Sequence, residues 1–271
     1  MSSIAFIGGG NMASCIIGGM VAEGFKPEQI LVGTPSNSTR QRLADSYGVV
    51  TMSDNHQAAA KADLVVLAVK PHMMCEVVKD LAPALSHKPT IVSVAAGIPI
   101  KALRDWLGAD MPVVRAMPNT PSMLKSGATG LYASAPLTNQ RQRLIENIFE
   151  SVGYCCWLDQ ESLIDAVIAV SGSGPAYFFL MMDAMQKIGA ELGLTEQTAH
   201  DLCVHTALGA SRMASESGMT PTELRKQVTS PGGTTNAAIT SFQQQGLEDM
   251  FRQAMNSAVK RAEEMSRDYS T

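Results

Sequence analysis

The sequence predicts an α/β protein in which a Rossmann-type doubly wound domain is followed by an all-helical domain. Short apolar runs alternate with helical stretches up to about residue 160. The first run leads directly into three glycines, Gly8 to Gly10, and after Glu161 only helical patterns follow. This change of rhythm is typical of a nucleotide-type domain joined to a helical one. We therefore expect two domains, residues 1–160 and 161–271.

The predicted strands of the first domain are continuous apolar runs rather than alternating ones. Continuous runs indicate burial on both faces, as in a parallel sheet covered by helices. The runs are 4–7, 30–33, 64–69, 90–95, 113–116, 129–133 and 155–158. Between the earlier runs we expect helices over about 11–23, 39–47 and 74–85. Together they form the strand–helix alternation of a doubly wound sheet.

The second domain is predicted to be helical throughout. The expected helices are 163–170, 176–192, 196–217, 221–228, 235–245 and 247–267. Thr195 is a candidate N-cap, and Pro221 stands at a first-turn position. Gly193 and Gly246 are candidate helix stops.

This helical domain is rich in methionine and alanine, which suit tight helix packing. An elongated helical domain of this size does not readily bury all its apolar faces alone. We therefore expect a homodimer formed through it. The alternative is a self-contained helical bundle.

The composition indicates a globular, cytoplasmic protein. Of 271 residues, 45% are hydrophobic and 17% charged, and 25 acids against 21 bases give a net charge of −4. This acidic balance, without a Lys/Arg block, argues against a nucleic-acid partner. The longest apolar runs are interrupted well short of a membrane span, so no membrane segment is expected. The chain begins without a cationic leader, so no signal peptide is expected.

The five cysteines show no paired spacing, which favours reduced thiols. His200, Cys203 and His205 lie close in sequence but do not share one helix face well. Incidental polar groups on a helix therefore explain them better than a metal site, and no metal is expected.

The segment Gly8-Gly9-Gly10-Asn11-Met12-Ala13 fits the dinucleotide pattern G-x-G-x-x-A between a strand and a helix. Gly8 would permit a tight turn, Gly10 would let the backbone approach a pyrophosphate, and Ala13 would allow close helix packing. The free N–H groups at the helix start, around Asn11 and Met12, would face the phosphates. An ordinary turn is the alternative reading.

The residues after the second strand indicate which cofactor is used, because NAD enzymes usually carry an acid there. Here the segment contains Thr34, Ser36 and Arg40 and no carboxylate. Hydroxyls and a guanidinium can bind a 2′-phosphate that a carboxylate would repel, so NADPH is favoured, with NADH possible but weaker. A polar loop that caps a helix at Thr39 would explain the same residues.

Later strand ends are further candidate ligand positions, because ligands bind outside the carboxyl ends of such strands. One is the turn Ala68-Val69-Lys70-Pro71, and another is Ala95-Ala96-Gly97, where small residues would admit a nicotinamide or ribose. Each could equally be an ordinary strand exit.

The loop Ser230-Pro231-Gly232-Gly233-Thr234-Thr235 is the most informative segment of the second domain. It can present several N–H groups at a helix start, which suits a substrate carboxylate. The alternative is an interhelix turn with a threonine cap. For the glycine-rich stretch 171–177, a domain pivot and a close helix crossing are equally good explanations.

Six motifs then carry a resemblance to a known family. They are G-x-G-N-M-A, A-V-K-P, A-A-G, R-A-M-P-N-T-P, S-G-S-G-P-A-Y and S-P-G-G-T-T. In order and spacing they resemble pyrroline-5-carboxylate reductases from the first strand to the last helix. The resemblance implies a Rossmann domain, a helical dimerisation domain with interlocked partners, and often a decamer built from five dimers. Where some members carry Asp-Asn before the last loop, this chain has Lys226 and Gln227.

The resemblance also implies a site and a reaction. Asn55, Thr34, Ser36 and the 68–71 turn would touch NADP(H). The substrate would lie at Glu161, Ser230, Gly233, Thr234 and Thr235, although an acid such as Glu161 also simply favours a helix N-terminus. NADPH would reduce 1-pyrroline-5-carboxylate to L-proline, with the Thr235 hydroxyl at the ring nitrogen.

Two other functions fit part of the sequence. A β-hydroxyacid dehydrogenase would share the two-domain plan, but it usually carries a catalytic lysine where this chain has none before Lys187. A non-catalytic NADP-sensing protein would need the first glycine loop but not the 230–235 loop.

Overall fold

The computed structural model describes residues 3–269, and these form two compact units. The N-terminal unit comprises the described residues up to Ser173 together with those from Ala258 onward, and the helical unit comprises Gly174–Ser257. These units divide the chain at residues other than the predicted 160/161 boundary. The segment 161–173 and the last helix from Ala258 onward belong to the N-terminal unit, because they pack against it.

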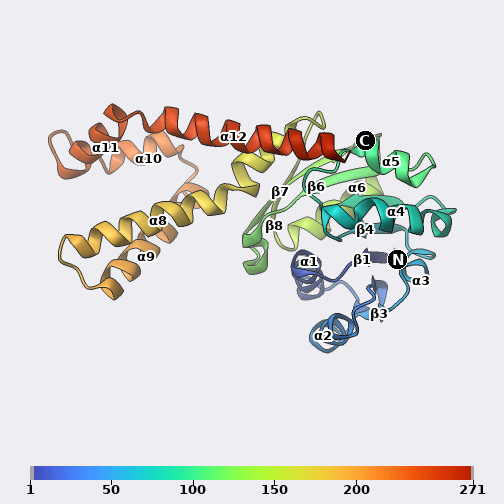
Figure 1. The fold of residues 1–271 in the computed structure, drawn as a ribbon. Coiled ribbons are helices and arrows are strands. Elements are labelled where there is room, and N and C mark those ends of the chain that lie inside the picture. The colour runs from blue at the N-terminus through green and yellow to red at the C-terminus, as the bar shows by residue number, and fades with distance from the viewer. Residues whose placement is uncertain (1–2, 270–271) are drawn as a thin grey trace. The chain divides into compact units, whose positions relative to one another are not determined.

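The N-terminal unit is built on one eight-stranded sheet with the order β3-β2-β1-β4-β5-β6-β7-β8 (Figure 1). The strands are β1 Ile4–Ile7, β2 Ile30–Gly33, β3 Val50–Met52, β4 Leu64–Leu67, β5 Thr90–Ser93, β6 Val113–Met117, β7 Gly127–Ala133 and β8 Gly153–Trp157. The first six are parallel, β7 runs antiparallel to β6, and β8 is parallel to β7. The order of the first six is that of a doubly wound dinucleotide-binding sheet, which confirms the predicted fold class.

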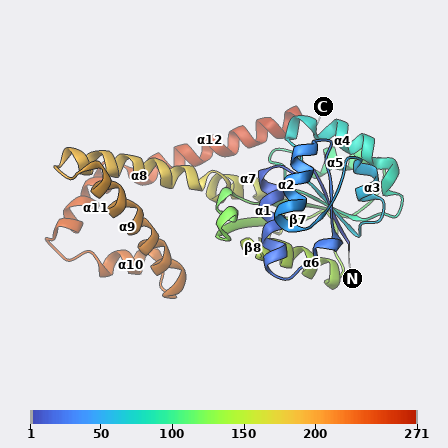
Figure 2. The same ribbon diagram turned by 90° about the horizontal axis from the view of Figure 1, so that it is seen from below.

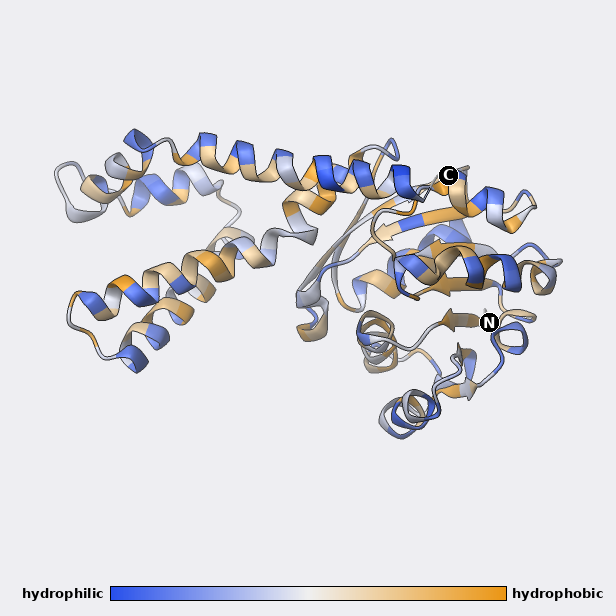
Figure 3. Cartoon of the chain, viewed as in Figure 1, coloured by the Kyte–Doolittle hydropathy of each residue, from blue (hydrophilic) through white to orange (hydrophobic). Residues whose placement is uncertain are grey.

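Helices cover both faces of this sheet (Figure 2). One face carries α1 Asn11–Ala22, α2 Asn37–Tyr47 and α6 Asn139–Glu150. The other carries α3 Asn55–Ala59, α4 Met74–Leu81 and α5 Ile100–Leu107. Neighbouring strand residues alternate between the two cores, so Phe6 packs into one and Ile7 into the other. Both faces are therefore apolar, which explains why the strands are continuous apolar runs (Figure 3).

Several short elements lie outside the sequence prediction. β3 has only three residues, and α3 has only five and begins after the cap Asp54. The helices α5 and α6 begin after Pro99 and Thr138 and have one apolar face each. Short helical turns complete the unit: η1 Pro27–Gln29, η2 Pro71–Met73, η3 Ala82–Leu85 and η4 Thr120–Leu124.

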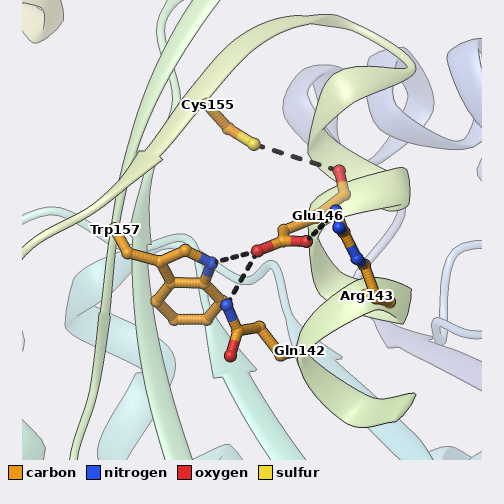
Figure 4. A network of polar contacts seen from close by, with 5 residues as sticks. All are labelled: Gln142, Arg143, Glu146, Cys155 and Trp157. Atoms are coloured by element: carbon orange, nitrogen blue, oxygen red, sulfur yellow. Dashed lines mark hydrogen bonds and ion pairs between the residues drawn. The ribbon is translucent and has the colours of Figure 1, made fainter. Parts of the chain in front are cut away.

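The edge strand β8 is fastened to α6 by a polar network (Figure 4). Trp157 Nε1 and Gln142 Nε2 donate to Glu146 Oε1 at 2.8 and 2.9 Å, and Arg143 donates to Oε2 at 2.9 Å. The hydrogen bonds from Gln142 and then Trp157 lower the pKa of Glu146. Burial raises the pKa of the neighbouring Cys155 thiol to about 11.

The helical unit contains α8 Gly174–Glu191, α9 Glu196–Glu216, α10 Pro221–Gln227, α11 Thr234–Gln244 and the first half of α12 Leu247–Asp268. The predicted cap Thr195 is confirmed, since it accepts from the Thr198 N–H. Pro221 stands in the first turn of α10 as predicted, and Thr220 before it forms a capping box with Glu223. Gly193 and Gly246 have positive φ values of 105° and 74°, as helix stops require.

The interruption between the helices predicted as 163–170 and 176–192 is much shorter than expected, a bend at Ser173. A π-helical turn, Ile168–Gly172, joins α7 Leu163–Val167 closely to α8. Leu163–Glu191 is thereby long and apolar enough to cross a membrane by length and composition, although we had expected the apolar runs to end well short of that. One such helix is weak evidence for a membrane.

The apolar surface of α8 is open in the single chain. Its exposed apolar residues include Phe178, Phe179, Leu180 and Met185. Between α8 and the first half of α12, within the helical unit, lies a 450 Å³ groove whose lining includes Tyr177, Met181, Met250 and Phe251. Such a surface indicates contact with another apolar partner.

Candidate active site

The glycine loop between β1 and α1 forms an anion cradle. Gly8 has φ +99°, and a Cβ there would lie 2.7 Å from the Ala68 carbonyl oxygen, so the turn requires glycine. A Cβ on Gly10 would meet nothing within 4 Å, so the space above Gly10 is open. Packing thus accounts for Gly8, whereas the bare backbone at Gly10 suits the close approach of a ligand.

Gly10 is the N-cap of α1, and no side chain caps the helix. The first helical bond runs from the Ser14 N–H to the Gly10 carbonyl at 2.9 Å, so the N–H groups of Asn11 and Met12 have no acceptor within the helix. The first turn contains no acid. Free donors at the positive end of a helix dipole are an arrangement that holds a phosphate.

Hydrogen bonds hold the loop after β2 in a defined conformation. Ser36, not Thr39, caps α2: its hydroxyl accepts from the Thr39 N–H at 3.3 Å and from the Thr39 hydroxyl at 3.0 Å. The alternative that this polar loop caps a helix is therefore borne out, with Ser36 rather than Thr39 as the cap. Arg40 donates from Nη1 to the carbonyls of Thr34 and Pro35 at 2.7 and 2.8 Å, which holds the loop in shape.

Asn55 lies beside this loop at the start of α3. A Cβ on Gly33 would lie 2.7 Å from Asn55 Oδ1, so the two residues are in close contact. That oxygen is buried and has no hydrogen-bond partner among the described residues. A buried acceptor without a donor is costly, and a hydroxyl of a bound ribose would satisfy it.

The other predicted cofactor positions also lie at carboxyl ends of parallel strands. The segment Ala68–Pro71 follows β4, with Lys70 exposed before η2. Ala95 follows β5 and is nearly buried. Gly97 has φ +75°, and a Cβ there would lie 2.9 Å from the Cβ of Met265 in α12, so packing already explains this glycine.

Glu161 forms an ion pair inside the N-terminal unit. Its Oε1 accepts from Arg115 Nη1 at 2.9 Å and from the Ile100 N–H at 2.8 Å, which is the start of α5. Arg115 is buried, with a side chain 6% exposed, and its Nη2 has no partner among the described residues. Burial raises the pKa of nearby Asp165, and Arg115 partly offsets the rise. Glu161 thus braces the loop that contains Gly97.

The π-helical turn has a packing explanation of its own. A Cβ on Gly172 would lie 2.9 Å from the Met117 methyl carbon, and Asn119 Nδ2 donates to the Ser171 carbonyl at 2.9 Å. These contacts favour close packing as the reason for this glycine.

The 230–235 loop forms the second anion cradle, in the helical unit. Gly232 has φ +73°, and the Gly233 N–H donates to the Ser230 carbonyl at 3.0 Å. Gly233 is the N-cap of α11, with no side-chain cap and no acid in the first turn. The alternative of a threonine cap is therefore wrong, and the exposed side chains of Thr234 and Thr235 are not used to cap the helix.

Two arginines at these sites were not predicted to have a role. Arg42 donates to the Gly9 carbonyl at 3.0 Å, and Arg115 holds Glu161. Arg115 could have been noticed, because an arginine at the end of an apolar strand is seldom buried unless it is paired. Nothing in the spacing of Arg42 indicates its contact. Among residues 3–269 there is no group of three or more His, Cys, Asp or Glu that could hold a metal ion, and all five cysteines are free.

Three features define an NAD(P)H-dependent oxidoreductase that uses NADP(H). They are the parallel sheet, the glycine cradle at its carboxyl edge and the loop after β2, which contains no acid. Residues 161–265 match the model of pyrroline-5-carboxylate reductase dimerisation, and residues 3–97 match that of NADP oxidoreductase, coenzyme F420-dependent. The chain belongs to the pyrroline-5-carboxylate reductase family.

Individual relatives support this membership over the full length. A pyrroline-5-carboxylate reductase from Pseudomonas aeruginosa is 50% identical over 97% of this chain and 96% of its own length. The Vibrio alginolyticus enzyme is 44% identical over 97% of both chains. The solved structure from Coxiella burnetii has a TM-score of 0.94 at 44% identity, covering 98% of each chain. A Plasmodium falciparum pyrroline carboxylate reductase with NADP bound has a TM-score of 0.84 at 26% identity, covering 98% of each chain.

Proposed function

We propose that this protein reduces 1-pyrroline-5-carboxylate to L-proline with NADPH, the last step of proline biosynthesis. One observation carries the proposal: two helices, α1 and α11, begin at a bare glycine with no side-chain cap and no acid in the first turn. The first is placed for a pyrophosphate, and the second lies in the region that matches the family's dimerisation model. The bound NADPH supplies the hydride to the C=N carbon.

The cofactor is held by the carboxyl edge of the parallel sheet. The N–H groups after Gly8 and Gly10, at Asn11 and Met12, bind the pyrophosphate. Thr34, Ser36 and Arg40 bind the 2′-phosphate side of the ribose, and the free Asn55 oxygen accepts from a ribose hydroxyl. The remaining contacts come from Ala68, Val69, Lys70, Pro71, Ala95 and Gly97.

The substrate carboxylate binds at the start of α11. The N–H groups of Thr234 and Thr235 lie in the uncapped first turn of α11, where the helix dipole favours a negative group. Gly232 and Gly233 let the backbone come close to the carboxylate. Ser230 adds a hydroxyl, and Glu161, which Arg115 holds within the N-terminal unit, is the further substrate residue that the family resemblance implies. The Thr235 hydroxyl donates to the ring nitrogen or keeps it protonated as the charge moves.

The working form is a homodimer through the helical unit, and the family resemblance extends the proposal to a decamer of five such dimers. The exposed apolar residues of α8 support this, because a soluble monomer rarely leaves so large an apolar surface open. We place the protein in the cytoplasm, with no nucleic-acid or membrane partner.

The test is NADPH oxidation on addition of 1-pyrroline-5-carboxylate, with L-proline identified as the product and with controls that lack substrate. A β-hydroxyacid dehydrogenase would instead act on a hydroxyacid, and a sensing protein would bind NADPH without turnover. Either of those results, in a folded preparation, would reject the proposal.

A further inference from the structure

Arg42, in the second turn of α2, reaches across to the glycine loop and to α1. Its Nη2 donates to the Gly9 carbonyl at 3.0 Å, and its Nη1 donates to Ser14 Oγ at 2.9 Å. Both bonds are charge-assisted, which makes them stronger than neutral hydrogen bonds. One planar guanidinium therefore links the loop and the helix that together form the first anion cradle.

The bond to Gly9 has a consequence for the next residue. The peptide between Gly9 and Gly10 is trans and planar, so its carbonyl and its N–H point in opposite directions. Because the Gly9 oxygen is held on the α2 side, the Gly10 N–H is turned away from α2. Glycines rotate freely, so without this bond the peptide plane would be poorly fixed.

The helix α2, which carries Arg42, packs tightly on the glycine loop and on α1. A Cβ on Gly9 would lie 2.7 Å from Thr39 Cγ2 and 2.8 Å from Leu43 Cδ1, so α2 packs directly on the loop. A Cβ on Gly18 would lie 2.9 Å from the Tyr47 ring, so the far end of α2 packs on α1 in the same way. The anchor point of Arg42 is therefore rigid.

We propose that Arg42 is a positioning residue for the cofactor, and that it fixes the peptide plane that aims the Gly10 N–H at the pyrophosphate. This inference rests on the proposed function of the same cradle as an NADP(H) site. Arg42 acts through the backbone, so it affects the part of the cofactor that NADPH and NADH share. A residue that contacted the 2′-phosphate would instead affect NADPH alone.

The experiment measures the dissociation constants of NADPH and NADH by titration calorimetry for the wild type, Arg42→Met and Arg42→Lys. Arg42→Met removes the bonds to Gly9 and to Ser14. It is expected to raise both constants by about tenfold, the size of the charge-assisted hydrogen bond to Gly9 that fixes the peptide plane. Arg42→Lys keeps the charge but cannot reach both acceptors in a fork, so about a threefold rise in both is expected. With saturating NADPH, kcat should stay within about twofold of the wild type, because the loss is one of binding.

The matched control is Arg143→Met, which removes an exposed, ion-paired arginine of α6 on the same unit and should leave both constants unchanged. Unchanged constants in both Arg42 variants would overturn the inference, as would a rise confined to NADPH. If Arg42→Met fails to fold, Arg42→Lys tests the inference alone: unchanged constants, or a rise for NADPH only, would overturn it. Wild type that binds neither cofactor would reject the proposed function, which is a separate result.

Discussion

At the scale of single residues, we propose that the side chain at the start of α2 selects the cofactor. Ser36 caps this helix, and we propose that it also contacts the 2′-phosphate of the cofactor. Asp and Asn cap helices as well as Ser does, so either can replace Ser36 without loss of the cap. Only Asp adds a negative charge.

We predict that Ser36→Asp raises the KM for NADPH by about tenfold or more while the KM for NADH changes by less than about threefold, because the carboxylate repels the 2′-phosphate. Ser36→Asn is the uncharged control. Steady-state kinetics with each cofactor provide the check. An equal change for both cofactors in Ser36→Asp would show that this residue does not read the phosphate.

Thr235 is the residue to which we assign the proton-donating role in the proposed reaction. We predict that Thr235→Ala lowers kcat by about a hundredfold, within the range that proton donation usually contributes. The helix should persist, because the N-cap is Gly233 and not a threonine. Thr240→Ala, at an exposed position on the same helix, is the control. Wild-type turnover in Thr235→Ala would remove the role assigned to this hydroxyl.

At the scale of elements, the end of α12 closes on the loop after β5. Gly97 and Gly108 both have positive φ, but only Gly97 has a neighbour, Met265, where a Cβ would go. We predict that Gly108→Ala lowers the free energy of unfolding by about 1 kcal/mol, the strain of the backbone alone. Gly97→Ala should cost about 1–3 kcal/mol more, since Met265 must also move. Urea unfolding measures both, and equal losses would mean that this contact is unimportant.

The network that joins α6 to β8 should make stability depend on acid. The pKa of Glu146 is lowered in the folded protein, so its stabilising contribution is present above its ordinary pKa of 4.5 and is lost as the pH falls through the folded value. We predict that Glu146→Gln is less stable than wild type at neutral pH and that the difference shrinks in acid. Unfolding followed by tryptophan fluorescence is the measurement, with Glu150→Gln as control. A difference that stays constant with pH would contradict this account.

The helices and strands with the clearest hydrophobic pattern were predicted most accurately. β1 and β2 were predicted residue for residue, because four consecutive apolar residues buried on both faces leave little ambiguity. β3 was missed because it is a three-residue strand without a clear pattern. The join between α7 and α8 was missed because Gly172 and Pro175 resemble breakers, whereas a π turn and the packing of Met117 accommodate them.

The candidate site was predictable only in part, for physical reasons. Gly8 stands where a positive φ of 99° restricts the residue type, so its role could be read in sequence, whereas Gly10 and Gly233 were found only through the motifs that contain them. The contacts of Arg42 with Gly9 and of Arg115 with Glu161 bring together residues 33 and 46 positions apart, which no local pattern encodes.

At the scale of the whole molecule, the open apolar surface of α8 predicts a partner subunit. Leu180 is 70% exposed in the single chain, so Leu180→Glu costs the monomer little. It should nevertheless shift the dimer to monomers, because the buried charge would be unpaired in the interface. Sedimentation velocity provides the check, with the exposed Gln243→Glu on α11 as control. A Leu180→Glu protein that sediments like the wild-type dimer would exclude α8 from the interface.

The central claim is that the cradle at Gly10 and the cradle at Thr235 serve one reaction. A crystal structure with NADP⁺ and L-proline bound tests it most directly. We predict pyrophosphate oxygens on the N–H groups after Gly10, the proline carboxylate on those of Thr234 and Thr235, and the proline ring in contact with the nicotinamide. The contradictory result would be proline at the loop with no nicotinamide in contact, from the same subunit or from its partner.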